Sequence, residues 1–399
     1  MQEYIPKISV KDYRYDLPDN KIAKYPLDIR DRSKLLLYQN GEISEHAFTI
    51  LPDILTSDTA LVFNNSKVIR ARIAFRKNSG AGIEVFCLSP ASPRLFDAAL
   101  SAVGKCSWNC TVGNAKRWKD EPLEKEFKYK DIAYKLTARK TRLNNEFLVD
   151  FEWDAPVSFS VILDCCGEIP IPPYLGRNSE KIDEVSYQTV YSKHEGSVAA
   201  PTAGLHFSDG VLAALQSKNI SIEEITLHVG AGTFKPMKGE FASEHKMHRE
   251  TFIINRSGLE RLYLKSDNLV AVGTTSARML ESLYWLGVTA NTRECYETEQ
   301  WDAYRFKTDM SVKDAFERIF NKMDKNGDKT VQATTQIMIV PGYEFKTVKG
   351  LITNFHQPES TLILLVAAFI GDKWKDIYDY ALNHDFRFLS YGDCSFLTK

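Results

Sequence analysis

Four short segments combine small, polar and histidine residues in the manner of ligand-binding loops. They are 200–207 (APTAGLHF), 227–234 (LHVGAGTF), 272–281 (VGTTSARMLE) and 352–361 (ITNFHQPEST). Each lies where a predicted strand stops, and in three of them a helix then starts. Ligands of α/β sheets bind at the carboxyl ends of the strands. We therefore predict that the polar tips of these loops converge on one ligand.

The first and fourth loops carry groups suited to proton transfer and hydrogen bonding. His206 and His356 are candidates for proton transfer, because an unperturbed histidine changes charge near neutral pH, and Thr202 supplies a hydroxyl group. Gly204 permits close approach of a backbone. Asn354 and His356 project from a strand end, and the apolar helix that follows is predicted to be buried. The alternative is a rigid turn with a surface histidine in the first loop and a helix-capping histidine in the fourth.

The second loop follows a predicted strand at 220–229 that ends near His228, a third candidate base. Gly230, Gly232 and Thr233 form a turn that could cradle a phosphate, a ribose or a sulfonium-bearing tail. The third glycine of the dinucleotide-binding fingerprint is missing, so this motif alone does not identify a nucleotide.

The third loop begins a helix. Thr275 or Ser276 is predicted to cap this helix, and the free N–H groups there favour an anion. Arg278 and Glu281 share one helix face at i,i+3 spacing. A capped helix with a surface ion pair is the alternative. We predict that replacing Arg278 or His356 lowers turnover more than stability.

No metal site is predicted. The spacings His245-x-x-His248 and Cys106-x₃-Cys110 lack the remaining ligands of a structural zinc site. Basic residues at 30–34 and 70–77 are candidates for phosphate contacts, although such clusters are also typical of a solvated face.

The sequence pattern around these loops predicts two domains. Short alternating runs with Gly, Asn and Pro breaks indicate a small inserted β-barrel domain at 73–157. The charged segment 116–130 is predicted to be a solvated loop or an edge. Alternating strands and helices elsewhere indicate a mixed-sheet α/β catalytic domain, discontinuous over 1–72 and 158–399. Ser208 is the predicted N-cap of a helix that runs to Gln216.

The composition is that of a globular protein. The 399 residues are 44% hydrophobic and 26% charged, and 51 basic residues face 52 acidic ones. A net charge of −1 gives no global attraction to nucleic acid, so RNA binding would need a local basic patch. The N-terminus has no secretory h-region, and the apolar run 362–370 is too short for a bilayer. We expect a cytoplasmic protein with reduced thiols and no membrane contact.

Taken together and in order, the motifs resemble the S-adenosylmethionine:tRNA ribosyltransferase-isomerase family. The resemblance rests on blocks that span nearly the whole chain. They include DLPDNKIAKYPLDIRDRSKLL at 16–36, LVFNNSKVIRARI at 61–73, GEIPIPPYLGR at 167–177, YQTVYSKHEGSVAAPTAGLHF at 187–207, TLHVGAGTFKPMK at 226–238, VAVGTTSARMLES at 270–282, PGYEFKTVKGLITNFHQPESTLILLVAAF at 341–369 and FRFLSYGDCSF at 386–396. The segments 105–123 and 286–334 depart from the family pattern.

The resemblance implies an α/β fold with an inserted barrel and a reaction without a metal or prosthetic group. S-adenosylmethionine is then the co-substrate, tRNA is the partner, and the protein is expected to be a monomer. The ribosyl part of S-adenosylmethionine moves to 7-aminomethyl-7-deazaguanine at the tRNA wobble position, giving epoxyqueuosine, adenine and methionine. The base would be His206, His228 or His356. Arg278 and the N–H groups near Thr275 and Ser276 would bind the methionine carboxylate, and Thr233, Glu281 or Asn354 the diol.

Two other functions are compatible with the residues alone. A methyltransferase would use Gly230-Ala231-Gly232 as its cofactor turn, but the usual acidic residue after the next strand is missing. A nonenzymatic relative would bind RNA through its β-barrel without catalysing a reaction.

Overall fold

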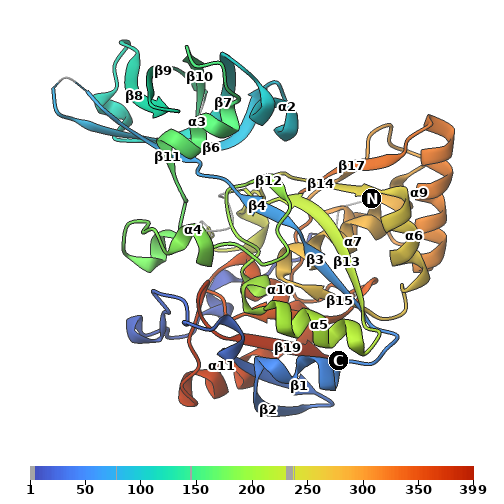
Figure 1. The fold of residues 1–399 in the computed structure, drawn as a ribbon. Helices are drawn as coiled ribbons and strands as arrows, with labels where there is room; N and C mark the ends of the chain where they lie inside the picture. Colours follow the sequence, from blue (N-terminus) through green and yellow to red (C-terminus); the bar gives the residue numbers. More distant parts are fainter. Residues whose placement is uncertain (1–4, 78, 144–145, 231–236, 238) are drawn as a thin grey trace.

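The computed structural model describes residues 5–77, 79–143, 146–230, 237 and 239–399. Figure 1 shows two bodies: a small curled sheet at the top of the view, and a larger α/β body below it. The predicted class, an α/β domain with an inserted barrel-like β unit, is confirmed. Within the described residues, no helix is both long enough and apolar enough to cross a bilayer.

The larger body is built on a ten-stranded mixed sheet with the order β16-β17-β14-β13-β3-β15-β18-β19-β1-β2. Its strands are β1 (Lys34–Gln39), β2 (Glu42–Ala47), β3 (Ala60–Asn64), β13 (Ser221–His228), β14 (Glu250–Asn255), β15 (Leu269–Val272), β16 (Glu297–Thr298), β17 (Thr330–Thr335), β18 (Val348–Asn354) and β19 (Cys394–Thr398). The neighbours β13, β3, β15 and β18 are parallel. Their carboxyl ends therefore lie on one edge, where three of the four loops begin. Strand β19 lies between β18, to which it is antiparallel, and β1, to which it is parallel.

Helices cover both faces of this sheet, which explains why the central strands are apolar throughout. In β15, Leu269 and Ala271 belong to one core, while Val270 and Val272 belong to the other, because successive strand residues point to opposite faces. Helices α6 (Arg256–Leu264), α7 (Thr274–Thr289), α9 (Val312–Asn326), α10 (Thr361–Ile370) and α11 (Lys373–Asn383) pack on the first face. Helices α1 (Leu51–Ile54) and α5 (Asp209–Ser217) pack on the second.

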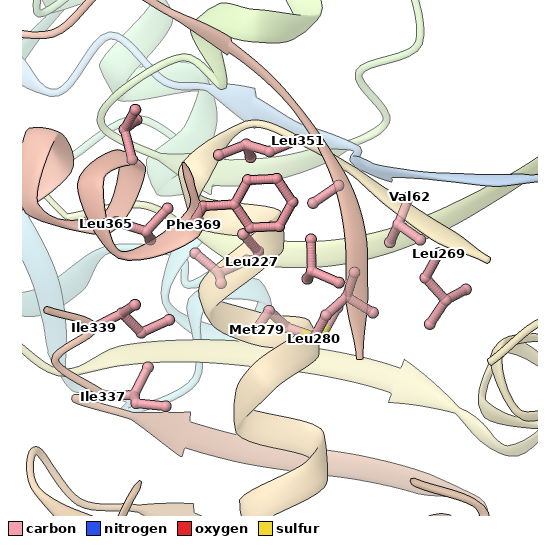
Figure 2. Packing of buried hydrophobic residues seen from close by; sticks show 14 of the residues in the cluster. Val62, Leu227, Leu269, Met279, Leu280, Ile337, Ile339, Leu351, Leu365 and Phe369 are labelled. Carbon is pink, nitrogen blue, oxygen red and sulfur yellow. The ribbon is translucent and has the colours of Figure 1, made fainter. Parts of the chain in front are cut away.

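The core of the first face holds the carboxyl-end loops in place. Figure 2 shows Phe369 of α10 beside Leu351 of β18, with Leu365 on the same helix, and Met279 and Leu280 of α7 lower in the same cluster. These five side chains are all at most 1% exposed. Each contributes about 1.5–3 kcal/mol by burial. The predicted burial of α10 is confirmed, so the loop that precedes it is anchored on a rigid element.

The second sheet has the order β11-β5-β6-β7-β10-β9-β8 and is antiparallel throughout. Its strands are β5 (Arg72–Arg76), β6 (Gly82–Ser92), β7 (Lys105–Gly113), β8 (Leu123–Tyr129), β9 (Ile132–Leu143), β10 (Glu146–Trp153) and β11 (Gly167–Glu168). The Nζ of Lys125 on β8 donates to the carbonyl of Ala74 on β5 at 2.9 Å, so the sheet curls back toward itself. The charged segment 116–130 includes the edge strand β8, as predicted.

This second sheet has a core of its own, in which Trp108 and Phe151 are fully buried. Helices α2 (Phe96–Ser101) and α3 (Phe159–Cys166) add to that core. The division of the chain near residues 72 and 158 stays a proposal. Shorter elements lie between the two bodies, namely β4 (Ser66–Val68), α4 (Asp183–Ser186) and β12 (His194–Ser197). The 3₁₀ helix η7 (Thr202–His206) packs beside β18, and α8 (Asp302–Arg305) precedes α9.

Two predictions about helix starts have different outcomes. The Ser208 hydroxyl accepts from the Val211 N–H at 3.2 Å, so the predicted cap of α5 is confirmed. The prediction that Thr275 or Ser276 caps α7 is wrong. Helix α7 begins at Thr274, behind Gly273 with φ of 94°, and no side chain caps it. Only glycine adopts such a φ without strain.

Candidate active site

A cavity opens at the carboxyl ends of β13, β15 and β18. Its empty volume is about 760 Å³, including the space at its open mouth. It is lined by residues 199–203, 273–275 and 353–357, together with Val229 and Ser390 among others. We call this the strand-end cavity. Segments from all four predicted loops therefore meet around one space. The second, third and fourth loops follow β13, β15 and β18, whose parallel order brings their carboxyl ends together.

The amino end of α7 forms one side of the strand-end cavity, where Thr274 and Thr275 line the wall. The first N–H groups of an α-helix have no partner within the helix, and the helix dipole makes this end partly positive. Ser276 is fully buried, and its hydroxyl has no hydrogen-bond partner among the described atoms. This side of the cavity suits a carboxylate.

His356 lies at the end of β18, on the wall of the same cavity. Its Nε2 is 2.8 Å from the Thr353 hydroxyl. Its backbone is held from two sides, because its N–H donates to the Tyr378 hydroxyl at 3.1 Å and its carbonyl accepts from the Tyr15 hydroxyl. Burial lowers the pKa of His356 from 6.5 to about 3. The ring is therefore neutral at physiological pH.

Asn354 links this cavity to His206. The Asn354 Nδ2 donates to the Leu389 carbonyl at 3.1 Å, and a carbonyl only accepts, which fixes the orientation of the amide. The same Nδ2 is 3.2 Å from Nε2 of His206, so Nε2 accepts and the ring proton lies on Nδ1, 2.9 Å from the Ser33 hydroxyl. Leu389 has a φ of 69°, which is a strained value for leucine.

Burial, followed by the positive charge of Arg387, lowers the pKa of His206 to about 3. Because both ring nitrogens already have partners, His206 orients Asn354 rather than facing the cavity directly. The carbonyl oxygen of Asn354 is buried without a partner among the described atoms.

Comparisons with known proteins identify the family of this chain. The family model of the queuosine biosynthesis protein matches residues 10–397. The S-adenosylmethionine:tRNA ribosyltransferase-isomerase of Trichlorobacter lovleyi is 35% identical over 397 residues, which are 98% of this chain and 99% of that protein. This chain belongs to the S-adenosylmethionine:tRNA ribosyltransferase-isomerase family. The crystal structure of the S-adenosylmethionine tRNA ribosyltransferase of Thermotoga maritima aligns over 96% of this chain and 99% of that one, with a TM-score of 0.46 and 24% identity.

Not all residues predicted from the family resemblance meet in the strand-end cavity. His228 lines a different cavity, with Asp97 and His194. Its ring stacks on Phe96 of α2 with centroids 4.2 Å apart, and burial lowers its pKa to about 4. The structure therefore brings His206 and His356 together through Asn354 and places His228 against the inserted sheet.

The glycines and threonines of the family motifs also do not all lie at the strand-end cavity. Thr202 lines the strand-end cavity. Gly204 serves packing, because a Cβ there would lie 1.8 Å from the Tyr191 hydroxyl oxygen. Gly230 is the last described residue of the second loop, and Gly232 and Thr233 lie outside the described residues.

Arg278 is absent from the lining of the strand-end cavity and bonds within the protein interior. Its Nη1 donates to Oε2 of Glu250 at 2.6 Å, and its Nε donates to the Ile337 carbonyl at 3.3 Å. Glu250 is 1% exposed and also contacts Nε2 of His248 at 3.1 Å. Burial alone would raise the pKa of Glu250, but the charges of Arg278 and His248 hold it below its usual value.

Glu281 is fully buried and accepts five hydrogen bonds. Oε2 accepts from the Tyr343 hydroxyl at 2.5 Å and the Lys346 N–H at 2.9 Å. Oε1 accepts from the N–H and hydroxyl of Thr347 at 2.9 and 2.8 Å and from the Val348 N–H at 2.9 Å. Glu281 therefore holds the turn that starts β18, the strand that carries Asn354.

Sequence reasoning missed Thr353, Leu389 and Ser390, which all line the strand-end cavity. The block FRFLSYGDCSF at 386–396 was the signal for the last two, because it belongs to the family pattern. The described residues contain no group of three or more His, Cys, Asp or Glu that could hold a metal ion.

Proposed function

We propose that this chain transfers the ribosyl moiety of S-adenosylmethionine to the aminomethyl group of 7-aminomethyl-7-deazaguanine at the tRNA wobble position. Rearrangement of the ribosyl group gives epoxyqueuosine, and adenine and methionine leave. The observation that supports this proposal most is the convergence of three strand-end loops around one cavity. A metal-free reaction without a prosthetic group, a monomer and a cytoplasmic location are further parts of the proposal.

The strand-end cavity suits both ends of S-adenosylmethionine. Val229, Phe355 and Leu362 supply apolar wall for the adenosine part. The amino end of α7 at Thr274 and Thr275 supplies N–H groups and positive potential for the methionine carboxylate. In this arrangement the carboxylate replaces the missing side-chain cap of the helix.

The proposed proton acceptor is His356. The sulfonium acidifies the ribose carbon next to it, and a neutral imidazole on the cavity wall takes that proton. The Thr353 hydroxyl, 2.8 Å from Nε2, orients the ring. The unpaired Asn354 oxygen is an acceptor for a ribose hydroxyl, and His206 keeps that amide in place.

Product analysis tests the proposal. The purified protein is incubated with S-adenosylmethionine and tRNA that carries the deazaguanine precursor. We expect free adenine and methionine in equal amounts, and only when the tRNA is present. S-adenosylhomocysteine as the product would instead indicate a methyltransferase. Tight RNA binding with unchanged S-adenosylmethionine would indicate a protein that binds RNA without catalysis.

A further inference from the structure

A second cavity adjoins the strand-end cavity on the far side of Asn354. Its empty volume is about 630 Å³, including its open side, and its walls include Pro26, Leu27, Arg30, Val185, His206 and Arg387. We call this the arginine cavity. Ser390 lines both cavities, and His206 reaches through the wall between them to Asn354. Two ligands placed in the two cavities would therefore meet at Ser390 and Asn354.

Two guanidinium groups give the arginine cavity a positive potential. The charges of Arg387 and Arg30 both lower the pKa of His206, in addition to the larger effect of burial, so both lie near that ring. Arg30 donates to the Gln188 carbonyl at 3.1 Å, which uses one of the five N–H groups of a guanidinium. Arg387 is 3.5 Å from the buried Asp393, which is a long contact. Guanidinium forks of this kind bind phosphate groups.

The surroundings of the arginine cavity expose apolar side chains in a way that suits unpaired bases. Val185 is 72% exposed and lines the cavity, and Ile29 and Tyr25 are 46% and 49% exposed beside the lining residues Pro26 to Asp28. Tyr25 is held in place, because its hydroxyl donates to Glu180 at 2.8 Å and the Arg177 guanidinium lies 4.3 Å from its ring centroid. Splayed bases of RNA loops pack on apolar and aromatic side chains, while their phosphates meet arginines.

We propose that the arginine cavity binds a splayed-out nucleotide of a tRNA loop, with Arg30 and Arg387 on its phosphate. Its base then points past Ser390 toward the strand-end cavity. This inference rests on the proposed function for the identity of the RNA. It adds where the RNA enters and which residues bind it. The lining of the arginine cavity holds two arginines and one acidic residue, Asp28.

The test uses the full chain and an anticodon stem-loop RNA that carries the precursor base, with affinity measured by fluorescence anisotropy over a range of salt concentrations. We expect Arg30→Gln and Arg387→Gln each to weaken RNA binding roughly tenfold. Each variant should also reduce the slope of log affinity against log salt by about 0.7. The affinity for S-adenosylmethionine, measured by calorimetry, should stay within about twofold of the wild type.

Arg318→Gln is the matched control, because Arg318 lies on α9, far from α4 and its Val185 in Figure 1. Arg387→Lys should recover part of the affinity by restoring the charge. If both glutamine variants bind RNA with the affinity and salt slope of Arg318→Gln, the inference is wrong. If Arg387→Gln does not fold, Arg30→Gln decides alone, because the Arg30 side chain donates to a backbone carbonyl, that of Gln188, and its loss leaves no described side chain without its partner.

The same preparations separate this inference from the proposed function. If the wild type releases adenine while both glutamine variants bind RNA normally, the arginine cavity is not the RNA site and the activity stands. If the wild type releases no adenine while the glutamine variants selectively lose RNA affinity, the activity is wrong and the RNA site stands.

Discussion

The substitution Glu281→Gln distinguishes a residue that holds the fold from one that binds the substrate. Glutamine keeps the size of the side chain but replaces one accepting oxygen with an NH₂ group. In the less costly orientation the NH₂ replaces Oε2 and faces the Lys346 N–H. The Tyr343 hydroxyl, which donates to Oε2 and accepts from Trp285 Nε1 at 3.0 Å, can turn and accept from the NH₂ with its second lone pair. One backbone N–H is thereby left unpaired, which costs about 1–3 kcal/mol.

The other three bonds, all to Oε1, change from charge-assisted to neutral, at about 1 kcal/mol each. The lower desolvation cost of a neutral amide offsets part of this sum. We therefore expect Glu281→Gln to lower the free energy of unfolding by about 3 kcal/mol. The affinity for S-adenosylmethionine should remain that of the wild type at temperatures where the variant is folded.

Urea unfolding measures the decrease in the free energy of unfolding, and amide hydrogen exchange shows which part of the fold is destabilised. The amides of residues 346–348 should lose protection before those of β3 in the sheet centre. The control is Glu260→Gln, which removes an exposed ion pair with Arg256 and should change stability by less than about 0.5 kcal/mol. The reasoning is refuted if Glu281→Gln is as stable as the control while its affinity for S-adenosylmethionine falls, because Glu281 would then bind the ligand.

Three further predictions follow from the site. His356→Gln should lower the rate constant of adenine release about 100-fold or more with little effect on the melting temperature, and near wild-type turnover would exclude His356 as the base. Arg278→Ala should destabilise the protein by about 3 kcal/mol, because the buried Glu250 loses its arginine partner and keeps only His248. This reverses the expectation from sequence, and a variant as stable as the wild type but inactive would restore that expectation. Stability should fall as pH drops from about 6.5 toward 4, because His206, His228 and His356 stay neutral in the fold and take up protons when unfolded. Each contributes up to about 1.4 kcal/mol per pH unit, and urea unfolding of His206→Asn should show a shallower pH slope than the wild type, whereas equal slopes would contradict the burial of that ring.

The positions of the loops could be predicted because they depend on simple rules. Apolar strands such as 269–272 imply a sheet covered on both faces, and parallel strands bring their carboxyl ends together. Thr275 and His356 accordingly share a cavity, although they are far apart in the sequence.

The roles of individual charged residues could not be predicted in the same way. Arg278 and Glu281 have the spacing of a helix-surface pair, but each bonds to a partner in another element, Glu250 in one case and the turn at 343–348 in the other. Likewise, His228 ends a strand as a catalytic residue could, but it faces α2. The placement of α2 depends on how the inserted sheet docks, which no local pattern encodes.

The location of β19 has a consequence for how the chain assembles. This strand begins at Cys394 yet lies between β18 and β1, so the hairpin of β1 and β2 reaches the rest of the sheet only through it. During synthesis on a ribosome, the first hairpin must wait for almost the whole chain to emerge before it gains its neighbour. Such a pairing of distant segments makes folding slow and leaves the early hairpin in need of protection from aggregation.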